Sequence, residues 1–325
     1  MTEFDVIDRF FNRAPARQAA LGIGDDGALL NASPVGRAVV CDTLVQGHHF
    51  YPDADPASLG HKSLAVNLSD LAAMGAKPEC FLLALTLPAV DEPWLKAFAG
   101  GLFGLADVFD CELVGGDTTR GPLSITVTAI GQIESKVALR RDRAEPGDDI
   151  WVSGELGAPS IAVRLLANSP EQGLRDAVSA SDYDQITEKL LWPQPRVVLG
   201  MSLRHFARAA IDISDGLIAD LGHIAARSRV GLELNTDLIP VAGALSALDP
   251  DRGLEAALNG GDDYELAFTA APENRLAIEE IGSQLGLQLT RIGLVTAGDS
   301  VQLTDTRGRP VSVGEHGYDH FSKQD

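Results

Sequence analysis

Short acidic motifs recur along the chain, and each stands beside glycine or at one end of an apolar run. Six are present: Gly24-Asp25-Asp26, Cys41-Asp42-Thr43, Leu68-Ser69-Asp70, Gly115-Gly116-Asp117, Asp212-Ile213-Ser214-Asp215 and Gly260-Gly261-Asp262-Asp263. Carboxylates held on glycine turns at the ends of strands suit hard cations such as Mg²⁺, and Mg²⁺ in enzymes usually arrives with substrate phosphates. The motifs together therefore predict a divided metal site.

Each motif also has a simpler explanation. Glycine and aspartate dominate β-turns for backbone reasons, so a single Gly-Asp pair is most often only a turn. Asp215 or Ser214 could equally be the N-cap of a helix, where negative charge is favoured. Asp70 is harder to dismiss, because a carboxylate buried on an apolar-striped helix would cost stability without a cation or hydrogen bonds.

Familiar nucleotide-binding motifs do not fit. Gly22 to Gly27 matches G-x-G-x-x-G, but it precedes Pro34 instead of opening a long helix, and two aspartates stand where a pyrophosphate would lie. The chain contains no Gly-Lys dipeptide, which excludes a Walker P-loop, and it lacks the His-Arg-Asp and Asp-Phe-Gly sets of protein kinases. A nucleotide would have to be held in another way.

Two other groups of residues remain open to interpretation. His49 follows His48 on an expected loop, and a substrate contact and a surface histidine explain it equally well. Arg140, Arg141 and Arg143 form the only dense basic cluster. They are either a solvated linker face or a phosphate clamp, because guanidinium groups bind phosphate bidentately.

Composition limits the function classes. The 325 residues are 45% hydrophobic and 22% charged, as in a folded two-domain protein, and 46 acidic against 26 basic residues give a formal charge of −20. Such a charge repels nucleic acids and anionic membranes, so neither is expected as a partner. A polyanionic substrate would need local help from metal ions or a few arginines.

The cysteines and the chain start favour a cytoplasmic protein. Cys41, Cys80 and Cys111 form no Cys-x-x-Cys pair, so neither a disulfide framework nor a zinc site is indicated. The first residues lack the basic and apolar regions of a signal peptide, and the best apolar run, residues 81–87, stops at Pro88. We expect no segment that enters a membrane.

Strand and helix patterns alternate through the chain. Helices are expected at 4–11, 55–75, 93–109, 159–166, 183–191, 197–207 and 216–227, and strands at 37–41, 81–87, 112–114, 123–130, 150–153, 209–213, 265–269, 288–292 and 301–304. The turn-rich stretch 144–149 predicts a boundary between domains 1–144 and 145–325. We expect an α/β (α+β) fold in which each domain is a mixed sheet with helices packed on it. Ligand sites favour domain interfaces, so a site between the halves is expected.

In their order and spacing the motifs resemble the thiamine-monophosphate kinase family. The resemblance rests on Gly22-Ile23-Gly24-Asp25-Asp26, Asp42-Thr43-Leu44-Val45, Gly47-His48-His49-Phe50, Asn67-Leu68-Ser69-Asp70, Gly115-Gly116-Asp117-Thr118-Thr119, Ile213-Ser214-Asp215-Gly216 and Gly261-Asp262-Asp263-Tyr264-Glu265-Leu266. It runs from about residue 3 to Phe321. Individual glycine turns are common, but this ordered set is specific.

The resemblance implies a two-domain fold like that of aminoimidazole ribonucleotide synthetase. It also implies ATP-dependent phosphorylation of thiamine monophosphate to thiamine diphosphate, with several Mg²⁺ ions, by a homodimer joined mainly through N-terminal strands. Because the acceptor phosphate is largely ionised near neutral pH, we expect direct in-line attack without a protein nucleophile. The alternatives are another ATP-using member of the superfamily, such as selenophosphate or aminoimidazole ribonucleotide synthetase, and a non-enzymatic cation-binding protein.

Site residues follow from the same resemblance. The implied Mg²⁺ ligands are Asp26, Asp42, Asp70, Asp117, Asp212, Asp215 and Cys41; the implied ATP contacts are Gly116, Asp117, Arg141 and Ser214; the implied substrate contacts are His49, Asp262 and Tyr318. Val40 and Cys41 stand where the family usually has Ser or Thr, which leaves only main-chain carbonyls as ligands there. The family's Gly-Gly-Glu-Asp is Gly-Gly-Asp-Asp here, which shortens the reach at Asp262.

Overall fold

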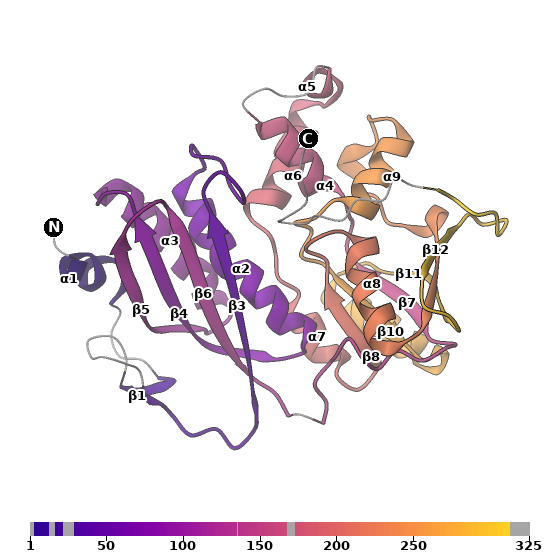
Figure 1. Ribbon diagram of the computed structural model, residues 1–325, viewed down its shortest axis with the longest axis horizontal. Coiled ribbons are helices and arrows are strands. Elements are labelled where there is room, and N and C mark those ends of the chain that lie inside the picture. Colours follow the sequence, from indigo (N-terminus) through magenta and orange to yellow (C-terminus); the bar gives the residue numbers. More distant parts are fainter. Residues whose placement is uncertain (1–2, 13–16, 22–28, 135, 168–172, 313–325) are drawn as a thin grey trace. The chain divides into compact units, whose positions relative to one another are not determined.

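The computed structural model describes residues 3–12, 17–21, 29–134, 136–167 and 173–312, which form two compact units (Figure 1). Unit 1 contains the described residues up to Leu71 together with Ala76–Ala138. Unit 2 contains Ala72–Gly75 and the described residues from Leu139 onward. The predicted site residues Asp26 and Tyr318 lie outside the described residues.

Unit 1 is built on a four-stranded mixed sheet. Its strand order is β3-β6-β4-β5, and only β4 and β5 run parallel. The elements of this unit are α1 (Glu3–Val6), the π-helix η1 (Ile7–Phe11), β1 (Ala19–Leu21), β2 (Leu29–Leu30), β3 (Arg37–Val45), α2 (Pro56–Ala73), β4 (Lys77–Leu87), α3 (Glu92–Val108), β5 (Glu112–Arg120) and β6 (Ser124–Gln132). Strands β1 and β2 pair separately.

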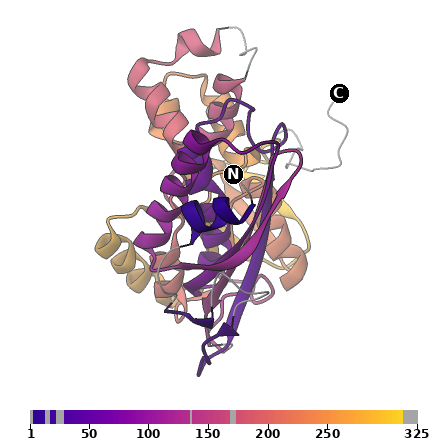
Figure 2. The ribbon, with the colours of Figure 1, turned by 90° about the vertical axis from the view of Figure 1, so that its left-hand side faces the viewer.

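Helices α2 and α3 cover one face of this sheet, as the two perpendicular views show (Figure 1 and Figure 2). The buried stripe of α2 contains Leu64, Leu68 and Leu71, all fully buried. Strand β6 alternates buried and half-buried residues along its length, which is the period expected when only one face of a strand packs on a core. On the opposite face, Ala19 of β1 and Leu30 of β2 pack in a cluster with Cys80, Leu82 and Ile130. The rest of this face, called the uncovered face below, is exposed or half-buried within the described part of the chain, and Val39 there is 62% exposed.

Two acidic motifs of unit 1 lie inside strands, which corrects the expectation that they follow them. Strand β5 continues through Gly115-Gly116-Asp117 to Arg120. A bulge explains the glycines: Phe81 pairs with Leu113 but Leu82 pairs with Gly115, so β5 carries one extra residue. A Cβ on Gly116 would lie 1.8 Å from the Leu83 carbonyl oxygen, so only glycine fits. Strand β3 likewise extends past Asp42 to Val45.

Unit 2 contains a six-stranded mixed sheet of order β12-β9-β11-β7-β10-β8, in which only β12 and β9 run parallel. Its elements are β7 (Asp149–Ser153), α4 (Ala158–Leu166), α5 (Leu174–Ala177), α6 (Ala180–Leu191), α7 (Val197–Leu203), β8 (Ala207–Asp212), α8 (Leu217–Ser228), β9 (Gly231–Asn235), η2 (Thr236–Leu238), η3 (Gly243–Leu245), α9 (Pro250–Asn259), β10 (Leu266–Ala270), η4 (Pro272–Asn274), α10 (Arg275–Leu285), β11 (Leu289–Thr296) and β12 (Val301–Thr304).

The central strands of unit 2 are buried on both faces. Ile150 and Val152 of β7 belong to a core that also contains Leu217 and Leu221 of α8. On the other face of β7 the Trp151 ring stacks on Phe268 of β10, with ring centroids 6.3 Å apart. All five residues of both strands are buried, which matches their nearly continuous apolar character.

The expected fold class is confirmed, because each unit is a mixed sheet with helices packed on it. Strands β1, β2 and β9 and helices α5, α9 and α10 were not predicted. Most predicted elements are present with ends shifted by a few residues, although α7 is shorter than expected and ends at Leu203. Among the described residues no helix combines the length and apolar character needed to cross a membrane.

Candidate functional site

In unit 1, helix α2 fixes the backbone of Asp42. The Asp42 amide donates to Oδ1 of Asn67 at 3.1 Å, and Nδ2 of the fully buried Asn67 donates to the Ser63 carbonyl at 3.2 Å. Strand β3 is an edge strand, so its outward amides have no strand partner, and Asn67 supplies one at this position. Asp70 follows Asn67 by three residues and so lies about one helical turn further on. The structure thus brings the Asp42 and Asp70 segments together.

Asp117 lies far from Asp42 within the same sheet. Asp42 pairs with Val127, Val127 with Leu83, and Leu83 with Gly116, so one row crosses the sheet from edge to edge. Three strand spacings separate the two edges by roughly 14 Å. Val127 and Leu83 are buried, which puts the Asp42 side chain on the helix-covered face.

The next row across the sheet has the opposite orientation. It joins Thr43, Thr126, Ala84 and Asp117, and the hydroxyls of Thr43 and Thr126 are 2.9 Å apart. Thr43, Ala84 and Asp117 are exposed, so Asp117 belongs to the uncovered face. Asp42 and Asp117 of one chain therefore lie at opposite edges and on opposite faces of the sheet.

Cys41 and His49 also belong to unit 1. The Cys41 sulfur accepts a hydrogen bond from the Thr128 hydroxyl at 3.4 Å on the uncovered face, away from the Asp42 side chain. The Val45 amide donates to Nδ1 of His49 at 3.0 Å. An accepting Nδ1 carries no proton, so Nε2 of a neutral His49 carries the ring proton and is a hydrogen-bond donor.

In unit 2 the acidic motif forms the turn from β8 into α8. Asp212 ends β8 and is 4% exposed. The N-cap of α8 is Gly216, with no side-chain capping bond, so the alternative that Ser214 or Asp215 caps this helix is wrong. Oδ2 of Asp220 reaches back instead and accepts from the amides of residues 214, 215 and 216 at 3.0, 3.1 and 3.2 Å. Asp220 therefore holds the turn, a role that the sequence analysis missed.

Carboxylates crowd together at this turn. Burial, followed by the charges of Asp212 and Asp215, raises the pKa of Asp220 to about 7. Such crowding is what a bound cation relieves. Within the described part of the chain no three or more His, Cys, Asp or Glu side chains converge closely enough to hold a metal ion. Mg²⁺, however, keeps several waters and is commonly held by one or two carboxylates plus substrate phosphates, so the donor set fits Mg²⁺ by type.

The Asp262 segment lies directly beside this turn. The Asp262 amide donates to the Ser214 carbonyl at 2.9 Å, and the Tyr264 amide donates to the Ile213 carbonyl at 2.8 Å. The predicted substrate contact and the predicted nucleotide contact are therefore neighbours. The Tyr264 hydroxyl, another feature that the sequence analysis missed, donates to Oδ1 of Asp262 at 2.9 Å.

Asp263 and Glu265, in and next to this segment, make hydrogen bonds with other parts of unit 2. Oδ1 of Asp263 accepts from the Gly157 amide at 2.9 Å, whereas its buried Oδ2 has no hydrogen-bond partner. Burial raises the pKa of Asp263 well above its ordinary value. The buried Glu265 accepts from Nε of Arg196 at 2.6 Å and from the Ser153 hydroxyl at 2.5 Å.

Arg141 lies at the other end of α8. Its carbonyl accepts from the Ser228 hydroxyl at 2.8 Å, and Ser228 is the last residue of the helix. The 12-residue helix is roughly 18 Å long. The Arg141 backbone and Ser214 therefore lie near opposite ends of α8 and far apart within unit 2.

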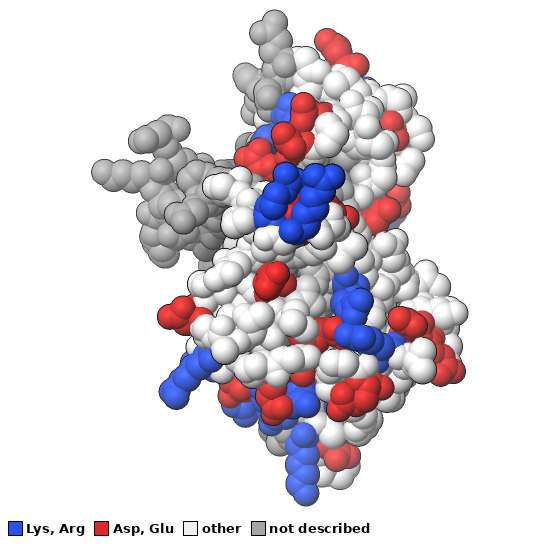
Figure 3. All heavy atoms as spheres, turned by 90° about the vertical axis from the view of Figure 1, so that its right-hand side faces the viewer, with Lys and Arg blue, Asp and Glu red and all other residues white. Residues whose placement is uncertain are grey.

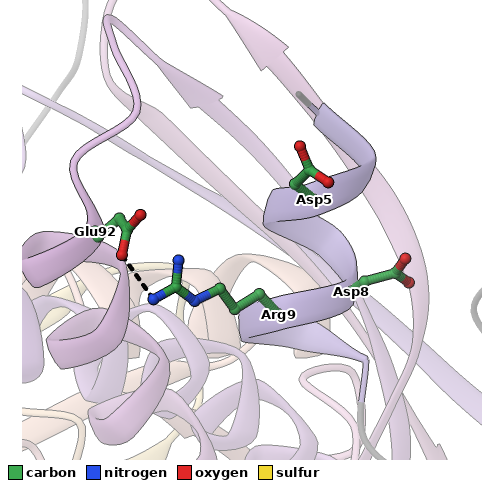
Figure 4. A pocket seen from close by; sticks show the side chains of 4 residues that line it. All are labelled: Asp5, Asp8, Arg9 and Glu92. Carbon is green, nitrogen blue, oxygen red and sulfur yellow. Dashed lines mark ion pairs between the residues drawn. The ribbon is translucent and has the colours of Figure 1, made fainter. Parts of the chain in front are cut away.

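Other charged surfaces lie outside these segments. A pocket of about 530 Å³ is lined by Asp5, Asp8, Arg9 and Glu92, where Arg9 pairs with Glu92 at 2.7 Å (Figure 4). None of the four is a predicted site residue. On the face drawn in Figure 3, the described lysines and arginines lie among acidic side chains and form no continuous basic surface.

Comparisons with known proteins agree with this architecture. Residues 24–133 match the family model of the AIR synthase related protein N-terminal domain, and residues 145–306 match that of its C-terminal domain. The chain is 46% identical to a thiamine-monophosphate kinase of Escherichia coli strain K12, with 98% of both chains covered.

Two solved structures extend the comparison. The crystal structure of thiamine-monophosphate kinase from Stenotrophomonas maltophilia K279a is 48% identical, with a TM-score of 0.85, and the match covers 96% of this chain and 98% of that one. AaThiL complexed with AMPPCP and TMP is 29% identical, with a TM-score of 0.75, and the match covers 98% of this chain and 96% of that one. The chain belongs to the thiamine-monophosphate kinase family.

Proposed function

We infer that this chain transfers the γ-phosphoryl group of ATP to the phosphate of thiamine monophosphate, which gives thiamine diphosphate and ADP. The observation that carries this function is the 46% identity to a thiamine-monophosphate kinase over 98% of both chains. The AaThiL complex with AMPPCP, an ATP analogue, and TMP supports both substrates. The chain is a phosphotransferase, with ATP as co-substrate.

We propose that Asp26, Asp42, Asp70, Asp117, Asp212 and Asp215, with the Cys41 carbonyl, hold several Mg²⁺ ions. The paired Asp42 and Asp70 segments and the crowded Asp212 turn support this assignment. Bound Mg²⁺ would supply the positive charge that offsets repulsion between two phosphorylated substrates and stabilises the transferring group. The formal charge of −20 makes such an offset necessary.

The chain's own residues would bind and orient the substrates. Ser214 and Arg141, with Gly116 and Asp117, would contact ATP, while His49, Asp262 and Tyr318 would contact thiamine monophosphate. With Nδ1 of His49 accepting from the Val45 amide, the Nε2–H group of a neutral His49 would donate to an acceptor atom of that substrate. A phosphate oxygen of thiamine monophosphate attacks the γ-phosphorus directly, and the bond to the ADP oxygen breaks. A phosphorylated protein trapped with ATP alone would overturn direct transfer.

We propose that the enzyme is a homodimer whose uncovered sheet faces pack together. The exposed Val39 and the outward Thr43 and Thr126 support this face as the interface. Strands β3 and β5 are opposite edges of one sheet, so one chain alone does not bring Asp42 and Asp117 together. We propose that β3 of one copy lies beside β5 of the other, so that Asp42 and Asp117 from different copies contribute to one site. A two-fold packing of the sheets can bring unlike edges together.

Mixed dimers test this arrangement. Asp42→Ala and Asp117→Ala are each expected to abolish turnover. A dimer of one variant with the other would contain one site that lacks both carboxylates and one intact site. Random mixing of two-fold dimers should therefore restore roughly a quarter of wild-type activity. No recovery, despite exchange of subunits measured by mass, would mean that each site is confined to one chain.

We propose that residues 1–144 supply most metal and nucleotide contacts and the dimer face, while residues 145–325 complete the active site. We also propose a cytoplasmic location. The thiols of Cys80 and Cys111 are buried and free, and burial raises the pKa of Cys80 to about 12. Such inert thiols are suited to a reducing compartment.

A product assay tests the proposed function. The purified protein is incubated with Mg²⁺ and ATP, and thiamine monophosphate, free thiamine and aminoimidazole ribonucleotide precursors are offered in parallel. Thiamine diphosphate formed only from thiamine monophosphate is the expected result. Phosphorylation of free thiamine, or turnover of an aminoimidazole precursor alone, would contradict it.

A further inference from the structure

The Asp262 segment has an unusual backbone. Asp262 has φ of 70° and Tyr264 has φ of 50°, so two residues with side chains occupy the left-handed region within three positions. Aspartate tolerates this region, but an aromatic residue there is uncommon and costs energy. Such a conformation persists only where its surroundings over-determine it, and it is found mainly at functional sites.

The surroundings here are the turn from β8 into α8. Amides of Asp262 and Tyr264 donate to the carbonyls of Ser214 and Ile213, and the Ile213 amide donates to the Glu265 carbonyl at 2.8 Å. These bonds continue the antiparallel pairing in which Leu266 lies opposite Asp212. A Cβ on Gly261 would lie 2.2 Å from the Ser214 carbonyl oxygen, so the close approach requires glycine.

The left-handed backbone folds the Tyr264 side chain back onto Asp262. The Tyr264 residue is 8% exposed, and its hydroxyl donates to Oδ1 of Asp262 at 2.9 Å. Asp262 itself is half-buried. The hydroxyl therefore fixes the rotation of a carboxylate whose backbone is already fixed by Ser214.

We propose that Tyr264 is a positioning residue, which holds the Asp262 carboxylate so that it accepts hydrogen bonds from the amine-bearing, cationic ring portion of the substrate and not from its phosphate. This inference rests on the proposed function. An aspartate reaches one methylene less far than a glutamate, so a fixed orientation matters more at this position.

The chemical class of the bound group follows from charge. A carboxylate is an acceptor with negative charge, so it repels a phosphate and attracts an N–H donor or a cation. Thiamine monophosphate carries an aminopyrimidine, a positively charged thiazolium and a phosphate. Only the first two suit Asp262 directly, and free thiamine carries both of them.

The test is Tyr264→Phe, which removes one hydroxyl and keeps the ring. Binding of thiamine monophosphate and of free thiamine is measured by calorimetry or competition, alongside the kinetics. Both dissociation constants should rise by the same factor, roughly tenfold, the size that loss of one hydrogen bond to a charged group produces. The KM for thiamine monophosphate should rise with them, while kcat and the KM for ATP stay within about twofold of wild type.

Two further variants sharpen the result. Tyr183→Phe is the matched control, since Tyr183 lies on α6 and stacks with the Arg175 guanidinium 4.4 Å from its ring centre, a contact that phenylalanine keeps. It should change none of these constants. In an Asp262→Asn background the carboxylate is already lost, so Tyr264→Phe should add little further weakening.

The outcomes separate the two hypotheses. A wild-type protein that neither binds nor phosphorylates thiamine monophosphate overturns the proposed function and this inference with it. If the wild type is active, a Tyr264→Phe variant with unchanged thiamine affinity overturns the inference alone. Weakening confined to the monophosphate would place Asp262 at the phosphate instead. An equal rise in the KM for ATP with a lower melting temperature would mean that Tyr264 only supports the fold.

Discussion

The backbone amide of Asp42 donates a hydrogen bond to the side-chain oxygen of Asn67 at 3.1 Å, which ties edge strand β3 to helix α2. Asn67 is fully buried, and Asp70 follows it on the same helix. One amide side chain thus fixes the spacing between two of the proposed metal ligands. Asn67 acts by positioning Asp42, because it binds the backbone amide of Asp42 and not the carboxylate.

Replacing Asn67 should impair both stability and turnover. Asn67→Leu keeps the volume but leaves the Asp42 amide without this acceptor, which should lower the free energy of unfolding by about 1–3 kcal/mol. Displacement of Asp42 should lower kcat on the order of 10²-fold. Denaturant melts and initial rates measure the two effects. Asn274→Leu removes a donor to the Phe206 carbonyl and serves as control, since it should alter stability without altering kcat.

Gly116 should tolerate no side chain. The Cβ of Gly116→Ala would lie 1.8 Å from the Leu83 carbonyl oxygen and push β5 from β4, at a cost of about 1–3 kcal/mol. The KM for ATP should rise because Asp117 shifts with the strand. Gly100 lies at an exposed position of α3, where an added Cβ meets nothing within 4 Å, so Gly100→Ala should stabilise the protein by about 0.5–1 kcal/mol. Equal effects of the two variants on the melting temperature would argue against the close approach.

The Arg196–Glu265 ion pair should matter far more than an exposed one. Glu265 is 3% exposed, and Arg196→Met would leave its carboxylate buried without its cation, which should cost about 3–5 kcal/mol. Arg140→Met breaks the exposed pair with Asp142 and should leave the stability nearly unchanged, because solvent screens such a pair. Adding Glu265→Gln to Arg196→Met should recover part of the loss in a double-mutant cycle. No recovery would show that Arg196 stabilises by packing alone.

Asp263 should make stability fall as the pH rises. Its pKa is raised by burial, so the folded state retains a proton that the unfolded state releases above about pH 4. The stabilisation is complete below the unfolded pKa and is lost as the pH rises towards the folded pKa. Asp263→Asn keeps the acceptor for the Gly157 amide but does not titrate. Its unfolding free energy relative to wild type should therefore increase from pH 4 to pH 7. A constant difference would show that Asp263 does not titrate in this range.

The fold class and most elements could be predicted from periodicity, but several boundaries and contacts could not. Two adjacent glycines, Gly115 and Gly116, indicate a turn by their composition. In the structure they lie inside β5, because one belongs to a bulge and the other approaches the Leu83 carbonyl closely. Helices α9 and α10 went unpredicted.

The candidate site was predictable only as a list of residues. The spacing of the motifs identified Asp42, Asp117 and Asp212 as candidates, but it could not show that β3 and β5 are opposite edges of one sheet. Asp220, Asn67 and Tyr264 were missed as positioning groups because their roles depend on hydrogen bonds to backbone or side chains that only the folded chain brings together. Asp26 and Tyr318 stay predictions.

The most direct test of the proposed function traces the γ-phosphate of ATP into its products. ATP labelled at its γ-phosphate is mixed with the protein, Mg²⁺ and thiamine monophosphate in a single turnover, and label is traced in protein, inorganic phosphate and thiamine species. Direct transfer predicts that the label appears in the terminal phosphate of thiamine diphosphate at the rate of ATP loss, with none on the protein. Label on the protein before product forms, or in inorganic phosphate without thiamine diphosphate, would contradict the proposed function.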